Sequence, residues 1–218
     1  MSKSYNTFAG QNVGRIASLS DGVFSIAMTL LVLDLRAPAV EAIRSEADLW
    51  RALGALSPRL LMYVMTFLTL GIFWVGQQTQ LNHLHRSDRA LSWIHIAFLF
   101  GVSITPFSTN LLALFTTFRV ALLVYWLNVF YLGATLYWSW AYATGHALVK
   151  DDVTEVLSQG IRRRVLVAQS LYAAGALLCF VSPYASIAVF LAVQLHLGDP
   201  SENSRHECRV ASLSRAPS

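Results

Sequence analysis

The stretch that decides the fold is RIASLSDGVFSIAMTLLVLDL, which runs from Arg15 to Leu35. As a helix it is long enough to cross a bilayer, because about 20 mostly apolar residues span the hydrocarbon core. Ionisable side chains are costly at membrane depth, so Arg15 and Asp21 are expected to meet partners or water. The segment is therefore predicted to be a membrane helix with a specialised polar side.

The composition of the whole chain also indicates lipid surroundings. Of the 218 residues, 55% are hydrophobic and 13% are charged, against about 25% charged residues in an average soluble domain. Further apolar runs lie near residues 58–76, 90–115, 118–143 and 165–197. The sequence therefore predicts an all-α integral membrane protein.

Prolines and polar stretches set the expected boundaries. The first helix should stop before Ala37-Pro38, and Ser182-Pro183 should divide the last run, which is too long for one ordinary crossing. The prediction is a single transmembrane domain over residues 1–197 and a disordered polar tail over residues 198–218. Its six helices are expected near residues 15–35, 58–78, 90–115, 118–143, 165–182 and 184–197.

Two charged stretches are expected to lie in water. The mixed-charge stretch 36–57 is interpreted as a connector at the membrane surface, and the stretch 146–164 as an aqueous loop. Under the six-helix scheme, most lysines and arginines fall on the side of the two termini. The chain is therefore expected to be a multi-pass protein of the cell membrane with both termini in the cytoplasm.

Other functional classes find little support. The net charge of +4 does not indicate nucleic-acid binding, because the basic residues lie at the ends of apolar runs. Cys179 and Cys208 form neither a metal spacing nor a disulfide framework, and no thiolate or carboxylate completes a tetrahedral set with His83 and His85. Serines, histidines and aspartates are scattered rather than gathered at one depth. No enzyme activity, cofactor or resident metal is expected.

The first helix has two different faces. Ser18, Asp21 and Ser25 follow the spacing i, i+3, i+7 and form a narrow polar face, suited to hydrogen bonds with a neighbouring helix. A second, mostly apolar stripe lies on another side of the helix. Its members are Leu19, Gly22, Ile26, Thr29 or Leu30, and Leu33. Periodicity alone favours an ordinary packing or lipid-facing surface for this stripe over a pore wall.

This segment resembles the first helix of the endosomal and lysosomal potassium channel family, whose bacterial members have six helices per subunit. The family signature is Arg-x-x-x-Phe-Ser-Asp. Arg15, Ser20 and Asp21 match it, whereas Leu19 replaces the phenylalanine. The likeness covers most of the first half of the chain and continues through Gly22–Ala27, Phe73-Trp74, Asp88-Arg89 and Ser103–Phe107.

The resemblance implies a homotetramer in the lipid bilayer that conducts potassium ions passively through a central pore lined by the first helices. The pore constrictions would fall on Ile26, Leu30 and Leu33, with Thr29 as a hydroxyl ring. The sequence has no Thr-Val-Gly-Tyr-Gly filter, so selectivity would not come from that carbonyl cage.

The signature residues are expected to have a structural role. Helical geometry places Asp21 beside Ser18 and Ser25, on a different face from the apolar stripe. Arg15 belongs to the first turn, where its long side chain reaches the interface. We therefore expect Arg15, Ser20 and Asp21 to form a network that holds the first helix against its neighbours.

A secondary transporter of a small solute or ion is the alternative function. Such a protein uses discontinuous helices with ligand groups at mid-membrane. Pro106 and Pro183 are the features that favour it, and the lack of an internal sequence repeat weakens it.

Overall fold

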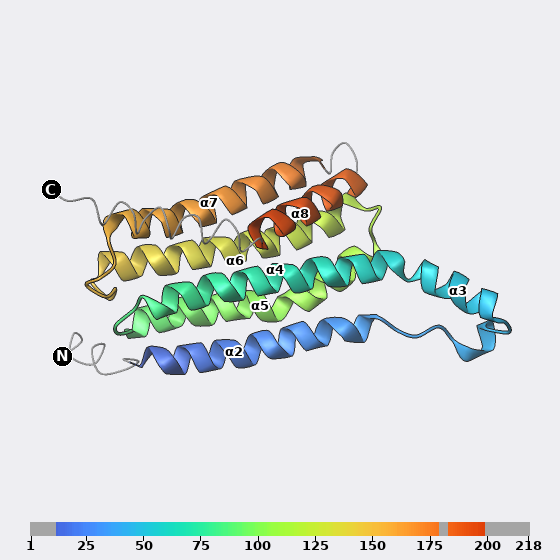
Figure 1. Ribbon diagram of the computed structural model, residues 1–218, viewed down its shortest axis with the longest axis horizontal. Helices are drawn as coiled ribbons and strands as arrows, with labels where there is room; N and C mark the ends of the chain where they lie inside the picture. Colours follow the sequence, from blue (N-terminus) through green and yellow to red (C-terminus); the bar gives the residue numbers. More distant parts are fainter. Residues whose placement is uncertain (1–11, 179–182, 199–218) are drawn as a thin grey trace, which may run out of the picture.

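The computed structural model describes residues 12–178 and 183–198, and the regular elements in these ranges are helices. The long helices lie side by side along the long axis of the molecule (Figure 1). The α-helices are α2 (Val13–Leu30), α3 (Glu46–Ala55), α4 (Ser57–Asn82), α5 (Arg89–Leu114), α6 (Arg119–Gly145), α7 (Glu155–Leu177) and α8 (Pro183–Gly198). Two 3-10 turns, η1 (Leu31–Asp34) and η2 (Val40–Ala42), follow α2.

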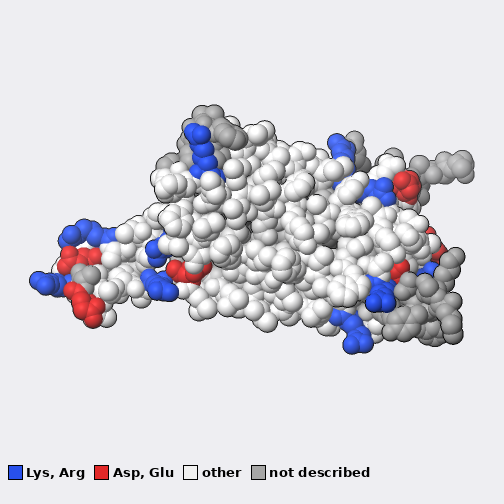
Figure 2. Space-filling model, turned by 180° about the vertical axis from the view of Figure 1, so that it is seen from behind, with Lys and Arg blue, Asp and Glu red and all other residues white. Residues whose placement is uncertain are grey.

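Four helices in the described ranges are long and apolar enough to cross a membrane. They are α2 continued by η1, α4, α5 and α6. On the face shown in Figure 2, charged side chains gather toward the two ends of the molecule, with a belt free of them between. This pattern is that of a multi-pass membrane protein, because charges avoid the hydrocarbon core. The count of six crossings remains a prediction.

The first turns of α7 correct the expected loop at 146–164. The helix begins at Glu155 rather than near residue 165, so residues 162–164 are helical. Thr154 caps it, since the Leu157 N–H donates to its Oγ1 at 3.3 Å, and the Glu155 carboxylate favours the positive end of the helix dipole. Hydropathy missed these turns because a charged helical segment in water has no apolar run. Residues 199–218, predicted as a tail, lie outside the described residues.

The connector over residues 36–57 contains α3, which lies beyond the end of the long helices (Figure 1). The Ser45 hydroxyl caps α3 by accepting from the Asp48 N–H at 3.2 Å, and Arg51 pairs with the Asp48 carboxylate at 2.7 Å. None of the α3 side chains is buried. Local capping, rather than packing, therefore defines this helix.

Aromatic rings fill the core between α2, α4 and α5. The ring of Phe98 lies 6.0 Å from that of Phe24 and 6.3 Å from that of Phe73, measured between centroids. All three side chains are buried. Aromatic side chains bury large apolar areas, so these contacts fix α2 against the rest of the bundle.

Close helix contacts explain two glycines. A Cβ atom at Gly101 of α5 would lie 2.7 Å from Cδ1 of Tyr131 on α6, and one at Gly133 would overlap the Gln169 side chain of α7. Small residues allow membrane helices to approach closely. The bundle therefore depends on these positions for the packing of α5, α6 and α7.

Pro106 does not interrupt α5, which continues from Arg89 to Leu114. A proline inside a helix removes one backbone donor. The continuity of α5 removes one of the two features that favoured a transporter with broken helices.

Two loops at one end of the bundle are clipped together. The His85 N–H donates to the Leu148 carbonyl at 3.1 Å, and the Lys150 N–H donates to the His83 carbonyl at 2.9 Å. Nearby, the Tyr142 hydroxyl donates to Asp88 at 2.8 Å. These bonds tie the α4–α5 loop to the α6–α7 loop.

Candidate functional site

Helix α2 buries one face against the bundle. Its buried residues are Ser20, Phe24 and Ala27, and Leu31 of η1 continues the same face. The spacing of four, three and four residues repeats about once per helical turn. This face sets the rotation of α2 and so decides which side chains point away.

The predicted apolar stripe points away from the bundle. The exposed fractions are 52% for Leu19, 61% for Ile26, 45% for Leu30 and 67% for Leu33. Thr29 is exposed on the same side, and its hydroxyl donates within the helix to the carbonyls of Ser25 and Ile26, both at 2.9 Å. The stripe is thus available to lipid, to another copy of the chain or to a pore.

Asp21 of the signature binds α4. Its Oδ1 accepts from the Trp74 indole N–H and from the Gln78 amide, both at 2.8 Å. Trp74 and Gln78 are one turn apart on α4, so they present two donors to the same carboxylate oxygen. Of the predicted polar face, Asp21 reaches a neighbouring helix, whereas the Ser18 hydroxyl bonds to the Gly14 carbonyl of its own helix at 3.0 Å.

Ser20 of the signature begins a buried relay across four helices. Its hydroxyl donates to the Ile16 carbonyl at 2.8 Å and therefore accepts from the Gln77 amide at 3.0 Å. The same amide nitrogen faces Nδ1 of His95 at 3.2 Å, and Nε2 of His95 faces the Ser139 hydroxyl at 3.2 Å. This orientation assigns the ring proton to Nε2. The relay joins α2, α4, α5 and α6.

Arg15 lies apart from this network. Its side chain is exposed on the first turn of α2. This guanidinium side chain makes no hydrogen bond or ion pair with another residue within 12–178 or 183–198, although the Arg15 backbone N–H donates to the Asn12 carbonyl at 3.2 Å. The structure therefore brings Ser20 and Asp21 to α4 but does not bring Arg15 to either of them.

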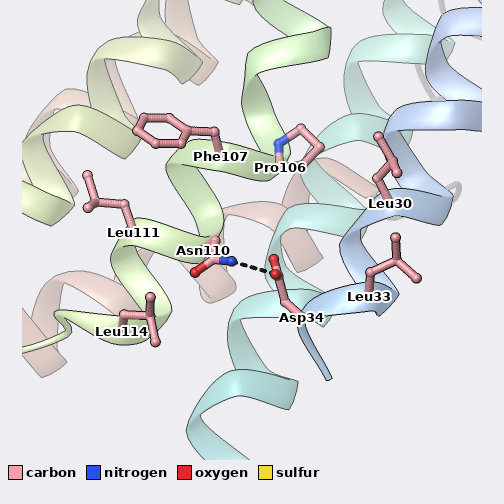
Figure 3. Close-up of a pocket in the computed structure, with 8 residues that line it drawn as sticks. All are labelled: Leu30, Leu33, Asp34, Pro106, Phe107, Asn110, Leu111 and Leu114. Atoms are coloured by element: carbon pink, nitrogen blue, oxygen red, sulfur yellow. Dashed lines mark hydrogen bonds between the residues drawn. The ribbon is translucent and has the colours of Figure 1, made fainter. Parts of the chain in front are cut away.

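The other end of α2 borders an open cavity of about 450 Å³. Figure 3 shows the Asn110 amide of α5 pointing across it to the Asp34 carboxylate, to which it donates a hydrogen bond. The remaining lining residues are mostly apolar and comprise Leu30, Leu33, Pro106, Phe107, Leu111 and Leu114.

The sequence alone does not identify the partners of the side-chain amides at positions 77, 78, 110 and 128. The structure adds Trp74, His95 and Ser139 to the network around the signature. The available signal was a pair of adjacent amides, Gln77-Gln78, at the end of an apolar run. No group of three or more metal-ligating residues occurs in the part of the chain that the structure describes.

Comparison with known proteins concerns mainly the half of the chain that contains these residues. The family model described as "Endosomal/lysosomal potassium channel TMEM175" matches residues 15–106. A potassium channel from Streptomyces collinus is 41% identical over 100 residues, which cover 46% of this chain and 47% of that protein. Human "Endosomal/lysosomal proton channel TMEM175" is 32% identical over 107 residues, or 45% of this chain and 21% of that protein. Each match thus spans half of the relative's length or less.

Two comparisons extend further. A potassium channel from Chamaesiphon minutus is 29% identical over 189 residues, which cover 84% of this chain and 92% of that protein. The crystal structure of a lysosomal potassium-selective channel TMEM175 homolog from the same organism superposes with a TM-score of 0.73 at 26% identity. That superposition covers 85% of this chain and 96% of the other chain.

Proposed function

We propose that this chain is a member of the endosomal/lysosomal potassium channel TMEM175 family and conducts potassium ions passively across a membrane. The observation that supports this function best is the exposed apolar stripe on α2, which lies within the matched residues 15–106. Large apolar residues that lie exposed on one side of a helix can contact another copy of the chain and can also line an apolar pore.

The proposed assembly is a homotetramer. One subunit offers a single α2, and a closed pore wall needs several copies of it around an axis. In that arrangement Ile26, Leu30 and Leu33 form successive apolar constrictions. Ile26 and Leu30 are about 6 Å apart along the α-helix, and Leu30 and Leu33 are also about 6 Å apart, because the 3-10 turn η1 rises about 2 Å per residue. Apolar rings of this kind gate by dewetting. Thr29 lies between the first two and is proposed as a hydroxyl ring.

The proposed location is the cell membrane, with six crossings and both termini in the cytoplasm. In this scheme the four long apolar helices supply four crossings, and α7 and α8 would supply the other two. With 16 residues, α8 would span about 24 Å, which is short of the roughly 30 Å hydrocarbon core. Slight local thinning of the bilayer accommodates such a mismatch.

Flux from liposomes that contain the purified protein tests the function. A channel releases potassium down its gradient at a rate proportional to that gradient, and sodium more slowly. A secondary transporter instead saturates with substrate and requires a coupled ion. Protein that stays monomeric in gentle detergent and in the bilayer, with no cation flux, would exclude the proposed channel.

A further inference from the structure

The open cavity of about 450 Å³ between η1 and α5 contains a carboxylate in mostly apolar surroundings. Among the described residues that line it, Asp34 alone is charged and Asn110 is the other polar residue. Asp34 ends η1 and follows Leu33 of the apolar stripe directly in the chain. Leu30 and Leu33 line the same cavity. The Asp34 carboxylate therefore lies where the apolar stripe ends.

The Asn110 amide of α5 holds the Asp34 carboxylate in place. Its Nδ2 donates to Oδ1 of Asp34 across the cavity, as the dashed line in Figure 3 shows. An amide is a neutral donor, so this bond fixes the carboxylate without cancelling its charge. The Asp34 side chain is half-buried, and a partly buried charge is screened less by salt than an exposed one.

In the channel proposed above, this end of α2 is the outer end, because α2 starts beside the cytoplasmic N-terminus and crosses the membrane once. Leu30 and Leu33 are the last two constrictions along α2. Asp34 follows them, so four copies of its carboxylate would surround the axis just outside the narrowest part of the pore.

We propose that Asp34 attracts potassium ions to the outer mouth of the pore and thereby raises its conductance. This inference rests on the proposed channel function and adds an entry step to it. An apolar ring carries no charge and cannot concentrate cations, whereas rings of aspartate or glutamate side chains do so in cation channels. Apolar walls around a charge strengthen its field and raise the local concentration of counter-ions, and the apolar lining of this cavity supplies such walls.

Single-channel recordings of the purified full-length protein in planar bilayers test the role of the charge. Asp34→Asn removes the charge but keeps an acceptor oxygen for Asn110. We expect potassium conductance to fall roughly twofold or more at about 10 mM salt, where the Debye length is about 30 Å, and to change little at about 1 M salt, where it is about 3 Å. Asp34→Glu keeps the charge and should stay near the wild type at both concentrations.

Glu46→Gln is the matched control, because Glu46 is an exposed carboxylate on α3 that does not line the cavity. It should leave the conductance unchanged at both salt concentrations. If the wild type conducts and Asp34→Asn conducts equally well at about 10 mM salt, Asp34 only ties η1 to α5; the inference then fails and the channel function stands. A wild-type protein without cation conductance would remove both.

A cysteine at position 34 provides a second readout within one variant. In a background without Cys179 and Cys208, Asp34→Cys should have a low conductance at about 10 mM salt. A sulfonate-bearing methanethiosulfonate reagent added to the outer solution restores a negative charge and should raise the conductance, whereas a trimethylammonium reagent should lower it further. Equal effects of the two reagents, or no effect of either, would contradict an electrostatic role for Asp34.

Discussion

At the residue scale, Ser20 and Asp21 are adjacent in the chain but bind α4 in different ways. Asp21 is exposed and accepts from two donors on one oxygen, whereas Ser20 is fully buried and accepts from the Gln77 amide, which also faces His95. Neither belongs to the exposed apolar stripe. We therefore propose that both residues position α2, whereas Ile26, Leu30 and Leu33 are the residues proposed for the constrictions.

Removal of the Asp21 carboxylate should weaken the attachment of α2. Asp21→Ala leaves Trp74 and Gln78 without their acceptor, so we expect the free energy of unfolding to fall by about 1–3 kcal/mol. Asp21→Asn keeps an acceptor oxygen and should cost less. Thermal denaturation in detergent measures both, with Ser18→Ala as the control because that hydroxyl bonds only its own helix. Intact tetramers with an altered potassium-to-sodium ratio would instead place Asp21 in the ion pathway.

Truncation of the stripe should raise ion leak. Leu30→Ala and Leu33→Ala would each remove four large side chains at one level of the proposed pore and so widen and hydrate a constriction. Single-channel or liposome flux recordings measure this effect, which we expect to be several-fold. Val32→Ala is the matched control, since Val32 is 47% exposed but lies outside the stripe.

Thr29 should act differently from its apolar neighbours. Thr29→Val keeps the side-chain shape but removes the hydroxyl oxygen that would face the ion, so the potassium-to-sodium ratio should change more than the total conductance. Unchanged conductance in Leu30→Ala, Leu33→Ala and Thr29→Val, with normal expression, would place the stripe against lipid or protein.

At the element scale, the relay from Ser20 to Ser139 connects α2, α4, α5 and α6 through buried side chains. Membrane helices gain little from hydrophobic attraction to one another, so hydrogen bonds and close packing decide how they associate. His95 is the central member, because its two ring nitrogens contact different helices.

His95→Ala should destabilise the bundle by about 1–3 kcal/mol, since it leaves the Gln77 amide and the Ser139 hydroxyl without one partner each and opens a small cavity. His146→Ala is the control, because His146 is exposed at the end of α6. Differential scanning of the two purified variants compares them. Equal melting temperatures for His95→Ala and the wild type would show that the relay adds nothing to stability.

The sequence predicted some elements and not others for physical reasons. The length and periodicity of the first helix are local properties, so the apolar stripe of α2 could be expected from residues 15–35 alone. The face that α2 buries, made of Ser20, Phe24, Ala27 and Leu31, was not predicted as a face. The partners of Asp21 and Ser20 could not be predicted, because the sequence of an apolar helix does not show which neighbouring helix its amide or histidine side chains contact. The start of α7 was missed for a related reason: its first turns are charged and depend on the Thr154 cap rather than on lipid.

At the scale of the whole molecule, the four long apolar helices form a bundle, and α7 and α8 extend this bundle on one side (Figure 1). The buried contacts of α8 with α4, through Gln194 and Thr69, place it within the same bundle. In the proposed six-crossing arrangement, these contacts would help to hold the short helix α8 at membrane depth.

The six-crossing scheme makes a definite statement about sides, because each crossing reverses the side on which the next connection lies. The α3 connector follows one crossing, so it should face outward, and the segment after α8 follows six, so it should face the cytoplasm. A cysteine introduced at Ala47 of α3, in a background without the native cysteines, should react with a membrane-impermeant maleimide added to intact cells. A protein with Cys208 as its sole cysteine should react only after permeabilisation. Labelling of both positions from the same side would contradict the five crossings that this scheme places between them, and α7 and α8 would then not both cross the membrane.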